Sequence, residues 1–225
     1  AGATPARQLV DIDPEEKVVG LVPVGPVVHS PIVLATVGGV IKRVKPGDEP
    51  RNAEAWDVIS LSGGDRVVFA GTAADTDFLA LVTSDAQLLR FQAAKVRPQG
   101  RGAGGMAGIS LREGARVIAG AAVPEELLAE AVVVTVAGSE GSLPGTGGGS
   151  VKVTPLDRYP AKGRATGGVR SHRFLRGEDE LVTAWVGVAP ARALSEDGKP
   201  FALPQADERR DGSGSPLPAP ILGIG

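Results

Sequence analysis

The sequence has no cysteine, only two histidines, and few aromatic residues, which make up 4% of the chain. Without cysteine the chain can form neither a disulfide framework nor a thiolate metal site. The two histidines, His29 and His172, stand far apart in the sequence, which argues against a histidine-based zinc site. No apolar run approaches the ~18 residues of a membrane span, and no signal-like segment opens the chain. Because the first residue is Ala1 and not methionine, we expect a fragment of a longer protein.

Glycine and proline, by contrast, are abundant. The 32 glycines and 18 prolines are about 22% of the 225 residues, against a typical share of ~12%. Both residues punctuate turns, so the composition predicts many short strands and few long helices.

The net charge of −2 conceals an uneven distribution of charge. Residues 86–116 contain six basic side chains and one acidic, and residues 150–176 contain seven basic and one acidic. Clustered cations matter more for anion binding than the total charge does. The alternative interpretation is that these side chains are scattered over ordinary solvated faces.

A glycine-rich segment that contains arginine recurs along the chain. The segment "QGRGAGGMAGISLREGARVI" (99–118) aligns with "KGRATGGVRSHRFLRGEDELV" (162–182), so that Arg101 falls on Arg164 and Leu111 on Phe174, both at a spacing of 63. A looser copy, "RNAEAWDVISLSGGDRVV" (51–68), stands 50 residues before the first. A fourth copy, "RRDGSGSPLPAPILGIG" (209–225), places Arg210 at the arginine position.

A strand–turn–strand pattern precedes each copy, as in "IVLATVGGVIKRV" (32–44) and "FLALVTSDAQLLRF" (78–91). About four strands in ~50 residues, repeated, are typical of the blades of a propeller. We therefore predict an all-β, propeller-like ring of about four blades with four strands each. The predicted blades are 14–62, 63–112, 113–176 and 177–225, with 1–13 closing the ring beside the last blade. A pair of β-sandwiches is the alternative, but it gives no reason for the basic loop to recur in phase.

These repeated segments resemble the C-terminal domain of the A subunit of bacterial type IIA DNA topoisomerases, DNA gyrase and topoisomerase IV. The resemblance covers essentially the whole chain through its repeats. It implies a β-pinwheel, whose blades exchange hairpins, and a basic outer rim that binds duplex DNA. It also implies a bacterial, cytoplasmic and nucleoid-associated enzyme with ATP and Mg²⁺ in its other parts and no cofactor in this domain. The implied partners are double-stranded DNA, the ATPase B subunit of the enzyme and the remainder of the A subunit.

The match to the gyrase signature is incomplete. Gyrase A subunits carry the heptapeptide Gln-Arg-Arg-Gly-Gly-Lys-Gly, the gyrase A box, which is associated with wrapping DNA. The nearest segment here, residues 99–105, keeps only one of the two arginines and lacks the lysine, with Gly100 and Gly104 in those places, and residues 162–168 are similarly incomplete. We therefore expect a topoisomerase IV-like subunit or a gyrase-like paralogue that bends DNA. A wrapping gyrase domain and a propeller-like protein-binding adaptor remain the alternatives.

The candidate DNA-binding side chains are basic residues in or near the repeated loops. Arg101 and Arg164 are expected to matter most, because arginine offers a bidentate fork to a phosphate. The other candidates are Lys162, Arg170, Arg173, Arg176, Lys95, Arg97, Arg90, Arg112, Lys42, Arg43, Lys45, Arg51, Arg209 and Arg210.

Glycines in the same loops could let backbone N–H groups approach phosphate oxygens. The box-like positions are Gln99, Gly100, Gly102, Gly104, Gly105, Gly163, Gly167 and Gly168. They could equally serve turn geometry, which is the expected role of Gly114 and Gly177. The loops do not lead into a helix, which argues against a dinucleotide site.

No catalytic or metal site is expected in this chain. Tyr159, the only tyrosine, is predicted to be a loop residue and not a nucleophile, because the DNA-cleaving tyrosine of the family lies in another domain. His172 is predicted to be a surface residue whose basic surroundings disfavour protonation.

Overall fold

The computed structural model describes residues 8, 12–13, 15–23, 30–48, 53, 55–139 and 149–225. In this part the chain forms short β-strands in four sheets of five, four, four and three strands. Only short 3-10 helices join them: η2 (Ala93–Lys95), η3 (Glu125–Glu130) and η4 (Leu156–Arg158). The prediction of an all-β chain with few helices is confirmed. None of the helices in this part is long and apolar enough to cross a membrane.

The sheets follow one another along the chain. The first contains β3 (Val67–Thr72), β1 (Ile32–Thr36), β2 (Val40–Val44) and β6 (Pro98–Gln99), with β7 (Met106–Ala107) also on β2. The second contains β8 (Val117–Val123), β4 (Phe78–Thr83), β5 (Gln87–Gln92) and β11 (Val169–Arg170). The third contains β12 (Glu180–Val188), β9 (Ala131–Gly138), β10 (Ser150–Pro155) and β15 (Ser215–Pro216). The fourth contains β16 (Ile221–Ile224), β13 (Ala193–Ser195) and β14 (Pro200–Phe201).

Each sheet is built on a hairpin, and a hydroxyl stabilises the turn in the first two. The hydroxyl of Thr36 accepts a hydrogen bond from the amide of Val40 (3.1 Å), and that of Thr83 accepts one from Gln87 (3.0 Å). Such side chain–backbone bonds favour tight turns. The apolar runs that flank these turns are buried in both strands of each hairpin.

The outermost strand of the first three sheets comes from the following repeat. Ile41 pairs with Met106, and Leu88 pairs with Val169. Val151 pairs with Ser215 in the same way. A sheet therefore does not coincide with a sequence repeat, because neighbouring repeats share strands. The repeat boundaries remain a prediction, and most of segment 1–13 lies outside the described residues.

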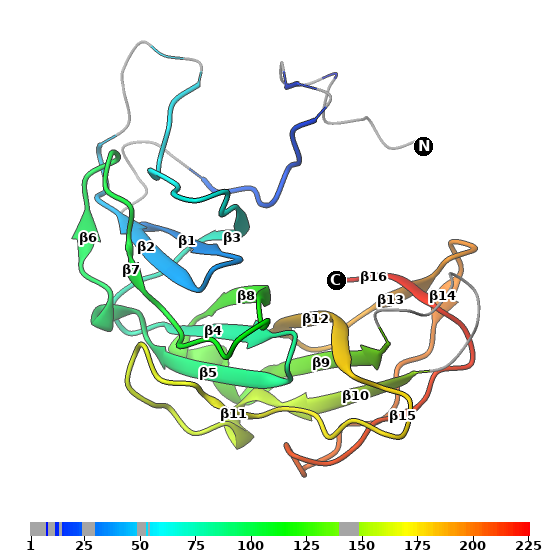
Figure 1. Cartoon of the computed structure of the whole chain (residues 1–225). Coiled ribbons are helices and arrows are strands. Elements are labelled where there is room, and N and C mark those ends of the chain that lie inside the picture. Colours follow the sequence, from blue (N-terminus) through cyan, green and yellow to red (C-terminus); the bar gives the residue numbers. More distant parts are fainter. Residues whose placement is uncertain are drawn as a thin grey trace.

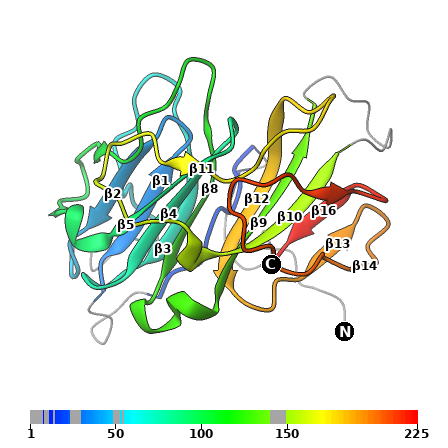
Figure 2. The same cartoon turned by 90° about the horizontal axis from the view of Figure 1, so that it is seen from below.

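The four sheets are arranged around an arc (Figure 1, and from below Figure 2). The inner strands β3, β8 and β12 contact one another in sequence. The strands β6, β7, β11 and β15 stand at the opposite edge of their sheets. This arrangement places the segments around residues 99–107, 162–170 and 209–216 on the outer rim.

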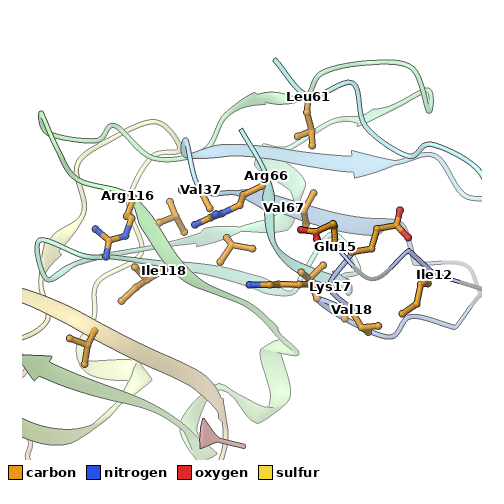
Figure 3. Close-up of a pocket in the computed structure, with 16 residues that line it drawn as sticks. Ile12, Glu15, Lys17, Val18, Val37, Leu61, Arg66, Val67, Arg116 and Ile118 are labelled. Atoms are coloured by element: carbon orange, nitrogen blue, oxygen red, sulfur yellow. The ribbon is translucent and has the colours of Figure 1, made fainter. Parts of the chain in front are cut away.

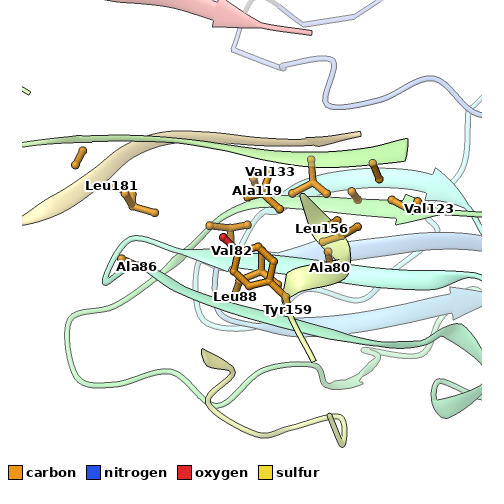
Figure 4. Packing of buried hydrophobic residues seen from close by; sticks show 14 residues of the cluster. Ala80, Val82, Ala86, Leu88, Ala119, Val123, Val133, Leu156, Tyr159 and Leu181 are labelled. Atoms are coloured by element: carbon orange, nitrogen blue, oxygen red, sulfur yellow. The ribbon is translucent and has the colours of Figure 1, made fainter. Parts of the chain in front are cut away.

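The main core lies between the second and third sheets and is made of aliphatic side chains from β4, β5, β8, β9 and β12 (Figure 4). Tyr159 and Leu156, both fully buried, close it from η4. The prediction that Tyr159 is a loop residue is confirmed for its backbone, which lies in a bend directly after η4, while its ring is a core side chain. Burial also raises the pKa of its hydroxyl.

Candidate nucleic-acid interface

Three glycine- and arginine-containing loops lie along the outer edge of the arc. We call residues 99–105, 162–168 and 209–214 the three rim loops. Each loop is joined to the preceding repeat by the same backbone hydrogen bond, at the positions that the sequence alignment pairs. The donors and acceptors are Ser60 N and Ala103 O (3.3 Å), Ser110 N and Thr166 O (3.1 Å), and Arg173 N and Gly212 O (3.0 Å). The repeated bond confirms the alignment and joins the loops into one continuous edge.

The first rim loop is held by a buried lysine of the first sheet. The ammonium group of Lys42 donates to the carbonyl oxygens of Val58 (2.7 Å), Arg101 (2.5 Å) and Ala103 (2.6 Å). The three acceptors use all three donors of the ammonium group. Burial lowers the pKa of Lys42, and the nearby carboxylate of Asp48 opposes that shift.

The third rim loop is held in the same way by Lys152 of β10. Its ammonium group donates to the carbonyl oxygens of Arg210, Arg209 (3.2 Å) and Gly212 (3.2 Å). Burial lowers the pKa of Lys152 to about 8, opposed by Asp207 and Asp211. Lys152 was not among the residues predicted for the site. Its alignment with Lys42 in the two hairpins is the signal that could have found it.

The second rim loop is held differently. The position equivalent to Lys42 is Leu89, which is fully buried. Instead, the loop's own Arg164 donates from Nε to the carbonyl of Lys95 (3.2 Å) and from Nη1 to the carbonyl of Ala107. Arg164 therefore joins its loop to η2 and to β7, which lies just after the first rim loop. These two hydrogen bonds occupy two nitrogens of the Arg164 guanidinium.

The last glycine of each of the first two loops packs against the sheet. Gly105 and Gly168 have left-handed φ values of +86° and +73°. A Cβ at Gly105 would lie 2.9 Å from the carbonyl oxygen of Ile41, and one at Gly168 would lie 2.5 Å from that of Leu88. These glycines permit close approach to the neighbouring strand, not to a phosphate. Gly114 and Gly177 have positive φ values and open surroundings, which confirms their role in turns.

Backbone N–H groups of the first loop are already engaged. The amide of Arg101 donates to the carboxylate of Asp48 (2.9 Å), and the amide of Ala103 donates to the carbonyl of Gly100 (3.1 Å). These two amides are therefore not a vacant cradle for an anion. The guanidinium of Arg101, in contrast, has no hydrogen bond or ion pair to the described residues and is partly exposed. Arg101 is thus available as a phosphate ligand through its side chain and not through its amide.

Three of the predicted DNA-binding side chains are buried, and the prediction for them is corrected. Lys42 holds the loop described above. Arg43, which is 1% exposed, donates to Asp75 (2.6 Å) and to the carbonyls of Ala93 and Val96. Arg90 lies with its guanidinium 4.8 Å from the ring centre of Phe78. These cations face carbonyls or a ring inside the protein, so they offer no open surface to a duplex.

The other predicted cations remain accessible. Arg101, Arg164 and Arg210 are partly exposed, and Arg209 is exposed but paired with Asp207 (3.2 Å). Arg112 lies 3.4 Å from Asp85, and Arg51 lies outside the described residues. The exposed members that form no ion pair with a described residue are Lys45, Lys95, Arg97, Lys162, Arg170, Arg173 and Arg176. Most of this last group lies beside the first two rim loops.

His172 is buried, so the prediction of a surface histidine is wrong. Its Nε2 accepts hydrogen bonds from the amide of Gly214 (3.2 Å) and from the hydroxyl of Ser150 (3.0 Å). Its Nδ1 therefore carries the proton and donates to the hydroxyl of Thr135 (2.9 Å). Burial, and then the charge of Lys152, lower the pKa of His172 to about 4. The expected disfavouring of protonation is confirmed, with burial as its main cause.

A separate cavity of about 1080 Å³ lies at the inner side of the arc, between β3, β8 and the described part of the N-terminal segment. Arg66, Arg116 and Lys17 line it together with valines and Ile118 (Figure 3). Arg116 pairs with Glu180 (2.8 Å). Because these cations face the inside of the arc, they do not extend the rim. The described residues contain no cluster of three or more acidic or histidine side chains that could hold a metal ion.

The sequence comparisons point to one family. Residues 77–124 and 145–184 match the family described as the DNA gyrase C-terminal domain, β-propeller. The chain is 30% identical over 183 residues to the DNA gyrase A subunit of Mycolicibacterium smegmatis, a match that covers 79% of this chain and 20% of that protein. It is 31% identical over 202 residues to the DNA gyrase A subunit of a Nocardioides species, covering 79% and 22%. The chain thus spans about a fifth of the length of these curated relatives.

The structural comparisons agree on the fold. The C-terminal domain of a DNA topoisomerase IV superposes with a TM-score of 0.78 at 19% identity, covering 99% of this chain and 69% of that one. A DNA gyrase A C-terminal domain superposes with a TM-score of 0.72 at 16% identity, covering 98% and 74%. The predicted β-pinwheel, with its strands shared between neighbouring repeats, is confirmed.

Proposed function

Because the chain belongs to the family of DNA gyrase C-terminal β-propeller domains, we propose that its outer rim binds duplex DNA for a type IIA topoisomerase. The duplex is held by phosphate contacts from exposed lysine and arginine side chains. Such contacts carry no sequence information, so binding depends on charge and on the ease of bending the DNA.

The observation that supports this proposal most is the continuity of the rim. One repeated backbone hydrogen bond joins all three rim loops to the repeats that precede them. Exposed cations that pair with no acid of the described residues, among them Lys95, Arg97, Lys162 and Arg170, lie beside the first two loops. A row of cations on one convex edge suits an extended polyanion that bends around it.

The test is the salt dependence of binding by the 225-residue chain. Roughly six phosphate contacts give a slope of about −5 in a plot of log affinity against log salt concentration. We expect this slope with labelled duplexes of random sequence, and little change between sequences. Affinity that does not vary with salt would refute a phosphate-binding rim and would favour the alternative of a protein-binding adaptor.

The proposed binding bends the duplex over part of the rim and does not complete a wrap. The third rim loop supports this extent, because acids lie beside its cations and one of these cations is ion-paired. Asp207 pairs with Arg209, and Glu208 pairs with Arg158. Asp211 lies next to Arg210 in the sequence. A tight turn of DNA requires nearly continuous neutralisation on its inner face.

Complete wrapping, as in a supercoiling gyrase, is the second candidate, and the similarity to DNA gyrase A subunits favours it. The two candidates differ in a topological measurement. Nicked circular DNA is incubated with the chain and ligated, and the change in linking number is read on a gel. We expect a small change, whereas a large, saturating change would establish wrapping and reject the partial bend.

In the full enzyme, the bent segment would be presented for strand passage, relaxation and decatenation. The ATPase B subunit, together with the remainder of the A subunit, would supply the DNA gate, the Mg²⁺ and the ATP. The domain itself would contribute no catalytic group or cofactor, and the enzyme would act at the bacterial nucleoid in the cytoplasm.

A further inference from the structure

We propose that Lys42 and Lys152 are positioning residues of the DNA-binding rim, which act by fixing the first and third rim loops and not by contacting the duplex. The inference rests on the proposed function, because the loops matter only if the rim binds DNA.

The two lysines make equivalent contacts at equivalent positions. Each stands one residue after the strand residue that pairs with the next repeat, Ile41 in one case and Val151 in the other. Lys42 binds the carbonyls of Arg101 and Ala103, and Lys152 binds those of Arg210 and Gly212. The sequence alignment pairs Arg101 with Arg210 and residue 103 with residue 212. A buried lysine therefore binds the same pair of loop carbonyls in two different repeats.

The consequence is a fixed orientation for the loop. With its carbonyls turned toward the buried ammonium group, the loop presents the Arg101 side chain away from the sheet, where it is partly exposed. A charged donor shared among carbonyls forms strong hydrogen bonds, and removing it leaves buried acceptors unpaired. Loss of the lysine should therefore make the loop mobile, so that the side chain of Arg101 no longer keeps one orientation.

The second repeat supplies a natural control. Leu89 occupies the equivalent buried position, so the fold accepts an apolar side chain there. Lys42→Met keeps most of the length of the side chain and removes the charge. Leu89→Met is the matched control, because it changes a buried side chain at the same place without removing a bond to a rim loop.

The experiment is a double-mutant cycle on the affinity for a random-sequence duplex, with Lys42→Met and Arg101→Ala alone and together. We expect each single variant to weaken binding by about three- to tenfold and the double variant to be no weaker than the worse single variant. Leu89→Met should bind as the wild type does. Amide hydrogen exchange at residues 101 and 103 should accelerate at least about tenfold in Lys42→Met and remain unchanged in Leu89→Met.

Three outcomes would overturn the inference. Losses that add in the double variant would show that Lys42 acts through its own charge. Unchanged binding by Lys42→Met, with the wild type binding DNA, would reject the positioning role and leave the proposed function intact. A wild type that does not bind the duplex would reject both. If Lys42→Met does not fold, Lys42→Leu, which places at this position the residue that the second repeat has there, carries the same test in a cycle with Arg101→Ala.

Discussion

The contact between the second rim loop and its sheet predicts a large effect of one methyl group. Gly168 has a φ of +73°, and a Cβ built there would lie 2.5 Å from the carbonyl oxygen of Leu88. The left-handed conformation alone costs a non-glycine residue about 1–2 kcal/mol. Forcing an atom into a packed contact adds roughly 1–3 kcal/mol. We therefore expect Gly168→Ala to lower the free energy of unfolding by about 3 kcal/mol.

Two other glycines of the chain separate these contributions. Gly114 has a φ of +75°, and nothing lies within 4 Å of the place that a Cβ would take, so Gly114→Ala should show the conformational cost alone, about 1 kcal/mol. Gly102 also has open space, and its φ is not in the left-handed region. Gly102→Ala should therefore be neutral or stabilise the fold by up to ~1 kcal/mol.

Thermal unfolding followed by circular dichroism measures all three variants. For a domain of this size each 1 kcal/mol shifts Tm by roughly 2–4 °C, so Gly168→Ala should melt about 6–12 °C below the wild type. Equal losses in Gly168→Ala and Gly114→Ala would refute the argument. They would mean that the loop does not pack tightly against β5 and that its glycines are needed for turns alone.

Two further predictions concern Arg101, Arg164 and His172. Arg101→Ala should weaken duplex binding by about three- to tenfold, roughly 0.7–1.4 kcal/mol, without changing Tm, because its guanidinium has no partner among the described residues. Arg164→Ala should lower Tm as well, because two carbonyls lose their donors; equal Tm values in the two variants would contradict this distinction. The folded pKa of His172, about 4, lies below its usual 6.5, so the unfolded state takes up the proton first. Stability should therefore be complete above pH 6.5 and fall toward pH 4 by up to about 1.4 kcal/mol per pH unit. His172→Gln should flatten that part of the pH profile of unfolding, and parallel profiles in the two proteins would disprove the assignment.

The sequence was sufficient to predict the repeats and the fold because both depend on local patterns. Alternation of apolar runs with turns placed the hairpins, and the spacing of 63 between Arg101 and Arg164 predicted which residues would make the same backbone bond. These signals repeat along the chain, so each copy supports the others.

The roles of individual cations could not be predicted in this way. Lys42, Arg43 and Arg90 sit in strands whose neighbours are apolar, yet charge alone placed them on the surface. Their burial depends on carbonyl groups or a ring that other segments bring to them, such as Arg101 O for Lys42. His172 is similar, because the partners that bury it come from β9, β10 and the third rim loop. Long-range contacts of this kind leave no mark in the local sequence.

Because neighbouring repeats share strands, the sheets can be completed only in a certain order during synthesis of the chain. The hairpin of the first sheet is complete at Val44, but the strands that cover the edge of β2 come much later, β6 from Pro98 and β7 from Met106. A ribosome that adds ~5–20 residues per second needs roughly 3–12 s to make that interval. During this time the edge of β2 exposes unpaired backbone groups that another nascent chain could pair with. The second and third sheets are likewise incomplete until β11 and β15 have been synthesised. If synthesis stops between two repeats, the sheet of the preceding repeat therefore stays incomplete, although its own hairpin has already formed.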